Sequence, residues 1–261
     1  MSGKGPSVAA AVLVLGVSAA ALLARPGEGR FGEWGDLRGR FVFDGPPPVP
    51  KPIDVRRRPD GAYFAGLGLH DESLLVDKGG GVANVLVYAL GTGGKAHPDY
   101  AKEAAKKVRL TARGGRFEPH FLTLRTSQTL LLTNAERVAV NFQYNTPGAG
   151  VDFNLVLRPG EEKEVRLKAL GRLPGRVRCA IHPWMGAWVW PHEGPYATAS
   201  GTDGTFVLAK LPVGEWEFQA WHERSGWVNP PGGVRGRFKV RIKPGKNDLG
   251  TIKLAPALFE R

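Results

Sequence analysis

Apolar and polar residues alternate with a period of two through much of this chain of 261 residues, a pattern typical of half-buried strands. The clearest runs lie at 138–143, 164–168, 176–179, 215–220 and 238–243. Turn sequences rich in glycine, proline, aspartate and asparagine separate them. Only 99–107 is typical of a helix, because Asp99 can cap its start and Glu103 can reach Lys107 at i, i+4. The pattern predicts an all-β protein.

The predicted strands form two groups along the chain. Residues 35–45 read as one strand, and the prolines between 46 and 52 read as an extended surface link, because proline cannot donate to a ladder. Strands expected at 73–76, 82–89, 108–112, 116–124 and 129–133 follow the link, and seven or eight strands lead up to and include the hairpin at 176–190. The alternation restarts after residue 196. A Greek-key sandwich suits the middle group.

Composition supports this organisation and adds a charge. The chain holds 36 glycines and 21 prolines, which fits many turns, and its length favours two domains. A net charge of +12 favours acidic partners, such as an anionic redox protein, an anionic polysaccharide or lipid headgroups. The basic residues are spread and are not interleaved with stacking aromatics, so no nucleic-acid partner is expected. A solvated basic surface is the alternative.

Residues 1–25 have the composition of an export signal. Lys4 supplies the positive start, 8–24 is a small and apolar run, and 18–20 offers small residues for cleavage. The run is slightly short for a spanning helix, which needs about 20 residues, yet an uncleaved N-terminal anchor stays open. We expect an exported protein, periplasmic, in the cell envelope or secreted, that meets a membrane only through this segment. Its single cysteine excludes an intrachain disulfide.

That cysteine begins the most informative stretch of the chain, 179–185. His182 follows Cys179 by three positions and Met185 follows by three more. A thiolate, an imidazole and a thioether on one short loop are a soft ligand set suited to copper. Val177 shares the parity of Cys179, so the thiol is expected to point inward. A buried, inert thiol with packing neighbours is the alternative interpretation.

This C-x-x-H-x-x-M spacing resembles the ligand loop of the cupredoxins, most closely the amicyanin type. Upstream, 117–120, 128–130 and 133–134 resemble the segment that precedes the first copper histidine of that family. The resemblance covers about 70–191 and implies a cupredoxin-like sandwich of copper-binding or electron-transfer type. It implies that Cys179 is the strongest ligand, that Met185 is the weak axial one, and that His182, near the surface, is the route for electrons.

The same alignment places the family's upstream histidine on Val140, with the following Asn141 retained. A trigonal site of one cysteine and two histidines therefore lacks a ligand. Three outcomes stay open. His120 substitutes for the missing imidazole, or Cys179, His182 and Met185 hold Cu(I) at low coordination, or the module has lost copper and serves as a scaffold.

Residues 202–221 resemble a second family, the carboxypeptidase regulatory-like or transthyretin-like sandwich domain. The strand with which that family usually opens matches 35–45 instead of any residue near 195. The resemblance implies that 34–50 and 193–258 form one sandwich and that the cupredoxin-like module, 70–191, is inserted into it.

The same sequence bears on functions outside copper chemistry. No G-x-S-x-G, H-E-x-x-H or G-x-x-x-x-G-K-[ST] motif is present, so we expect no enzyme. A carbohydrate or cell-surface binding module is the alternative, because Trp188, Trp190 and Trp221 are expected at exposed positions where they could stack on sugars. A structural envelope protein is the third hypothesis.

Overall fold

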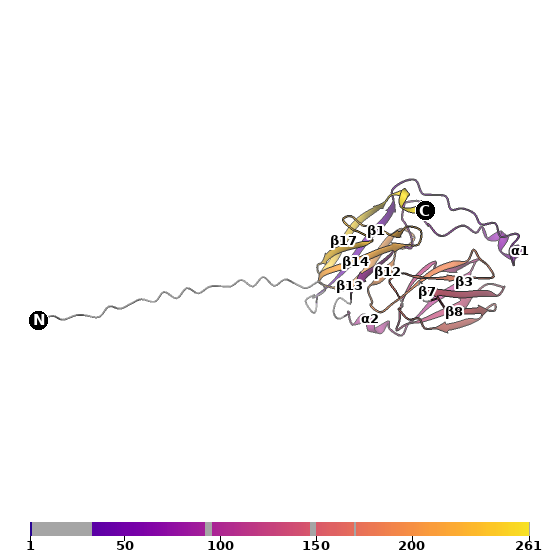
Figure 1. The fold of residues 1–261 in the computed structure, drawn as a ribbon, viewed down its shortest axis with the longest axis horizontal. Coiled ribbons are helices and arrows are strands. Elements are labelled where there is room, and N and C mark those ends of the chain that lie inside the picture. Colours follow the sequence, from indigo (N-terminus) through magenta and orange to yellow (C-terminus); the bar gives the residue numbers. More distant parts are fainter. Residues whose placement is uncertain (2–32, 92–95, 147–149, 170, 261) are drawn as a thin grey trace.

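The computed structural model describes residues 1, 33–91, 96–146, 150–169 and 171–260. The export signal predicted at 1–25 lies, apart from Met1, outside the described residues. Within the described ones the fold is all-β, as predicted, with four sheets arranged as two sandwiches (Figure 1). No helix of the described residues is long and apolar enough to cross a membrane.

The first sandwich combines strands from both ends of the described chain. One sheet has the order β13-β1-β17, from Thr205–Pro212, Trp34–Phe43 and Gly245–Leu254. The other has the order β12-β2-β14-β15, from Ala197–Ala199, Leu86–Leu90, Gly214–His222 and Gly226–Trp227, and β16 (Arg237–Ile242) pairs with β14. Strand β1 alternates strictly between buried and half-buried positions, so every second side chain enters the core.

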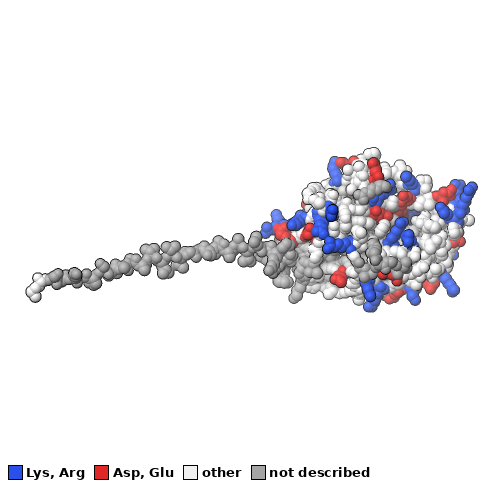
Figure 2. All heavy atoms as spheres, viewed as in Figure 1, with Lys and Arg blue, Asp and Glu red and all other residues white. Residues whose placement is uncertain are grey.

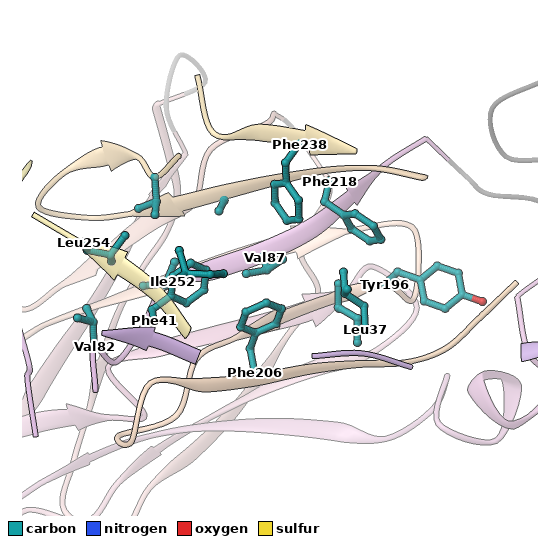
Figure 3. Close-up of a cluster of buried hydrophobic side chains, with 14 of the residues drawn as sticks. Leu37, Phe41, Val82, Val87, Tyr196, Phe206, Phe218, Phe238, Ile252 and Leu254 are labelled. Carbon is teal, nitrogen blue, oxygen red and sulfur yellow. The ribbon is translucent and has the colours of Figure 1, made fainter. Parts of the chain in front are cut away.

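Figure 3 shows the core of this sandwich. Phe41 and Phe206 stack at 5.1 Å between ring centroids, and Phe218 stacks on Phe238 at 5.5 Å. Strands far apart in the chain thus share one apolar core. The C-terminal 3₁₀ helix η2 (Pro256–Phe259) seals it with Phe259.

The second sandwich is built from consecutive strands. Its five-stranded sheet has the order β5-β11-β10-β7-β8, from Phe121–Arg125, Gly186–His192, Gly175–Arg178, Val140–Thr146 and Gly150–Leu157. Its four-stranded sheet has the order β4-β3-β6-β9, from Arg116–Glu118, Lys107–Arg113, Thr129–Asn134 and Glu162–Val165. Cys179 and Met185 belong to the apolar core between these sheets.

Three local predictions were wrong. The strand expected at 82–89 was placed in the inserted module, but β2 pairs with β12 and β14 and so belongs to the first sandwich. The helix expected at 99–107 is the single turn α2 (Asp99–Lys102), without a side-chain cap, because Lys107 already begins β3. The strand expected at 73–76 is reduced to one bridge between Val76 and Val82.

An apolar interface joins the two sandwiches. It buries Leu86, Tyr88 and Trp221 of the first sandwich against Phe121 and Trp190 of the second. The Tyr88 and Trp190 rings lie 4.4 Å apart. Two aromatic residues from each side make this a packed contact, so the sandwiches are held in a fixed relation by burial of apolar surface.

A strap, defined here as residues 52–70, connects the sandwiches a second time. It follows β1 after residues 44–51 and carries the short helices α1 (Gly61–Phe64) and η1 (Ala65–Leu67) to the side of the second sandwich, near β3 (Figure 1). The strap closes on itself at its base, where Pro52 bridges His70 and the Ile53 amide donates to the Leu69 carbonyl at 2.8 Å. Such closed loops with packed side chains are compact units.

Candidate metal site

The Cys179 loop begins where β10 ends. Val177 is buried while Arg176 and Arg178 are exposed, so the parity predicted for this strand is confirmed. Two backbone hydrogen bonds close the loop: the Met185 amide donates to the His182 carbonyl at 2.9 Å, and the Cys179 amide donates to the Met185 carbonyl at 3.3 Å. The Trp184 indole donates to the Gly115 carbonyl at 3.1 Å and fixes the outer edge of the loop.

The structure buries the three predicted ligand residues, Cys179, His182 and Met185, and brings the side chains of Cys179 and His182 together. Their exposed fractions are 2%, 0% and 1%. Cys179 Sγ lies 3.6 Å from His182 Nδ1. One metal ion can bond to both atoms across that separation, because metal–sulfur and metal–nitrogen bonds measure about 2.3 and about 2.0 Å. The donor set therefore fits a soft metal ion.

Backbone amides surround the sulfur. The amides of Asn141 and His182 both point to Cys179 Sγ, at 3.4 and 3.2 Å. Burial raises the pKa of the Cys179 thiol, but the hydrogen bonds from His182 and from these amides outweigh burial and lower that pKa overall. A thiol so placed ionises more readily, and the thiolate is the form that binds metals.

Asn141 fastens the loop to β7. Its Oδ1 accepts the Ala180 amide at 3.0 Å, and its Nδ2 donates to Asn154 Oδ1 at 2.6 Å. The side chain of Asn141, whose backbone amide donates to the sulfur, is therefore bonded to the loop on one side and to β8 on the other. The asparagine that the alignment retains thus has a structural role here.

Position 140 holds no ligand. Val140 is completely buried in the same core as Cys179 and Met185, so its predicted inward direction is confirmed. A histidine there would face the loop, but the valine side chain is a hydrocarbon. Among the described residues, no three His, Cys, Asp or Glu side chains come together in a group able to hold a metal ion.

His120 does not replace the missing imidazole. It stands before β5, which is separated from β10 by β11 in the sheet. Its Nε2 is hydrogen-bonded to Glu223 of the first sandwich, and its Nδ1 lies 3.5 Å from Glu72. The proposal that His120 completes the copper site was therefore wrong, because two carboxylates hold the ring elsewhere.

The remaining imidazoles also lie apart from the loop. His97 packs edge-on against Trp34, His192 stacks on Trp190, and His222 packs against Phe259. His70 lies at the base of the strap. Of the six histidines, all within the described residues, only His182 contacts Cys179.

The outer edge of His182 is covered, contrary to the prediction that it lies near the surface. Asp60, on the strap, has Oδ2 3.0 Å from His182 Nε2. Phe64 packs edge-on against the imidazole at 4.8 Å between ring centroids. Sequence reasoning missed both residues; the Asp60-Gly61 pair marks a turn, but nothing local indicates a partner 122 positions away.

Of the tryptophans assigned to sugar stacking, two are buried and Trp188 is half-buried. Trp190 and Trp221 are each 7% exposed, and the Trp188 indole donates to Glu223 at 2.8 Å. All three belong to the interface between the sandwiches. That expectation was wrong because these side chains face the other sandwich and not solvent.

A groove of about 990 Å³ lies at the open edge between β16 and β17. Its floor includes Trp227, Phe238 and Leu249, and its rim carries basic residues, among them Arg235 and Lys239. Elsewhere basic and acidic side chains are interspersed, as on the face shown in Figure 2.

Solved structures that match part of the chain include cupredoxins. A purple cupredoxin from Nitrosopumilus maritimus is 21% identical, with a TM-score of 0.28, and the match covers 33% of this chain and 99% of that one. An oxidised variant of amicyanin is 14% identical, with a TM-score of 0.29 and coverage of 41% and 98%. Auracyanin A, a blue copper protein from Chloroflexus aurantiacus, is 14% identical, with a TM-score of 0.29 and coverage of 33% and 98%. No protein-family model and no curated protein matches the chain.

Proposed function

We propose that this chain is an exported, non-catalytic copper-binding protein whose second sandwich, β3 to β11, is a cupredoxin-like module that holds Cu(I). Cys179, His182 and Met185 are the proposed ligands. The observation that carries the proposal is the 3.6 Å separation between Cys179 Sγ and His182 Nδ1, two side chains that are both buried. The first sandwich is proposed to be transthyretin-like, with the module inserted between β2 and β12.

Cu(I) is favoured over Cu(II) by the donors that are present. Thiolate and thioether ligands select Cu(I), whereas a blue Cu(II) site uses two imidazoles and one thiolate. Val140 removes one of those imidazoles. When bound, copper supplies a soft Lewis acid with accessible one-electron chemistry. The chain itself lowers the pKa of the thiol, orients the imidazole and excludes water from both.

Electron transfer to a partner through His182 has less support than copper binding does. The ring is 0% exposed and lies under Asp60 and Phe64, so no partner can touch it while the strap is in place. An anionic redox partner therefore stays a prediction from net charge alone.

The proposal is tested by titrating Cu(I), under reducing conditions, into the chain that begins after residue 33, with a coloured chelator as competitor. One Cu(I) per chain is expected, with binding lost in Cys179→Ser and weakened in Met185→Leu, a change that conserves volume. Arg178→Ser is the matched control, because it lies next to Cys179 on the exposed face of β10. Equal affinity in all four proteins would contradict the proposal.

A second candidate function, binding of an anionic polysaccharide, is favoured by the groove beside β16. Arginine pairs well with carboxylate or sulfate groups, and Trp227 offers an aromatic surface for a sugar ring. Retardation in gels containing polygalacturonate, but not in gels containing neutral dextran, is expected, and Trp227→Ala together with Lys239→Ala should remove it. Equal mobility in both gels would exclude this candidate.

A further inference from the structure

The strap is anchored over the Cys179 loop by aromatic side chains of α1. Phe64 is 0% exposed and packs against both His182 and Trp184, with its ring centroid 5.4 Å from that of Trp184. Tyr63 donates its hydroxyl proton to Glu136 at 2.8 Å, and Glu136 is itself buried. The tip of the strap therefore has a fixed place on the second sandwich.

Asp60 stands just before α1 in a conformation that serves this contact. Its φ is 53°, in the left-handed region that most residues avoid and that aspartate tolerates better than most. The following Gly61 is required as well, because a Cβ there would lie 2.2 Å from the Val55 carbonyl oxygen. The backbone thus turns at Asp60, the residue whose carboxylate contacts His182.

The carboxylate determines which ring nitrogen of His182 carries a proton. A carboxylate only accepts hydrogen bonds, so Nε2, 3.0 Å from Asp60 Oδ2, must be the donor. Nδ1 then faces Cys179 Sγ. The imidazole is 0% exposed while the Asp60 side chain is 41% exposed, so Asp60 is the link between the buried ring and solvent.

We propose that Asp60 is a positioning residue that makes Nδ1 the copper-binding nitrogen of His182 and holds the ring at the sulfur. This inference rests on the proposed function. A metal-binding histidine commonly donates its other N–H to a carboxylate, and removal of that partner typically weakens metal affinity 10–100-fold. The strap, which joins two sandwiches, thus contributes an outer residue to the metal site of one of them.

The test compares three substitutions in otherwise unchanged protein. Asp60→Gly removes the carboxylate without backbone strain, because glycine adopts positive φ freely. Asp60→Asn keeps an oxygen that can accept from Nε2 and also tolerates this conformation. Asp54→Asn is the matched control, since Asp54 lies on the same strap and pairs only with Arg56 among the described residues. The probes are Cu(I) with a competing chelator and nitrogen-15 NMR of the histidine rings.

In the competition, Asp60→Gly is expected to weaken Cu(I) binding about 10–100-fold. Asp60→Asn should fall between it and the unsubstituted chain, and Asp54→Asn should bind as the unsubstituted chain does. In NMR, the Nε2 proton of His182 should be retained in both metal-free and Cu(I)-loaded protein, and Nδ1 should change on loading. In Asp60→Gly the Nε2 proton signal should be lost to exchange with water.

The outcomes separate this inference from the function beneath it. Cys179-dependent Cu(I) binding that Asp60→Gly leaves unchanged would overturn the role of Asp60 and keep the copper site. Loading that alters Nε2 instead of Nδ1 would also overturn it. Absence of Cys179-dependent binding in the unsubstituted chain would overturn both.

Discussion

His120 joins the two sandwiches through a charge cluster, and its replacement should change how stability depends on pH. The ring stands at the start of β5 and is 13% exposed. It lies between Glu223, which follows β14, and Glu72, which follows the strap. Arg116 donates to Glu72 at 2.8 Å and so belongs to the same cluster. A protonated imidazole here links three segments of the chain.

The magnitude follows from the pKa. Burial lowers the pKa of His120, but the hydrogen bonds and charges of Glu223 and Glu72 outweigh burial and raise it from 6.5 to about 9. At about 1.4 kcal/mol per pKa unit, this corresponds to about 3 kcal/mol of stability. Because the folded pKa is the higher one, that stability is fully present below pH 6.5 and is lost as pH rises through about 9.

The assay is urea unfolding of unsubstituted protein and of His120→Gln at several pH values from 6 to 10. At pH 6 the variant should be less stable by about 3–5 kcal/mol, because Glu223 loses the imidazolium and Glu72 is left with Arg116. The two curves should approach each other as pH rises through 9. His70→Gln, at an exposed imidazole, is the control and should follow the unsubstituted curve. Parallel curves for His120→Gln and the unsubstituted chain would refute the reasoning.

Two further predictions concern the Cys179 loop. Val140→His should supply the missing imidazole and produce a visible thiolate-to-Cu(II) band that the unsubstituted chain lacks. The added volume should lower the free energy of unfolding by about 1–3 kcal/mol. A colourless Cu(II) titration would contradict this. Phe64→Ala should loosen the strap and speed labelling of Cys179 by a thiol reagent at least tenfold, because a buried Phe→Ala change removes about 3–5 kcal/mol of packing. Phe259→Ala, equally buried in the first sandwich, is the control, and equal labelling rates in the two variants would count against the strap as a cover.

The sequence was informative wherever the pattern is local. The parity of Val177 and Cys179 correctly predicted an inward thiol, and the Cys179 and His182 side chains that the spacing places on one loop lie together, while the role of Met185 as a ligand stays a prediction. The inward direction of Val140 was also predicted from the alternation of apolar residues, and the side chain is completely buried, although the neighbouring Asn141 is buried as well. These features depend on neighbours within a few positions.

Long-range pairing could not be read from alternation. The run at 82–89 looks like any other half-buried strand, and its place in the first sandwich depends on β14, about 130 residues later, as between Tyr88 and Gln219. His120 was one candidate for the missing imidazole, whereas Glu72 and Glu223 decide its place. Asp60 contacts His182 because the strap folds back on itself and closes at its base. The alternation of apolar and polar residues does not indicate this closure.

The central claim is that Cys179 and His182 share one Cu(I) ion, and X-ray absorption at the copper edge of the Cu(I)-loaded protein tests it most directly. We expect a low-coordinate Cu(I) with sulfur neighbours and a single imidazole, and loss of the short copper–sulfur contribution in Cys179→Ser. A site with two imidazoles, or a spectrum without sulfur that Cys179→Ser leaves unchanged, would contradict it.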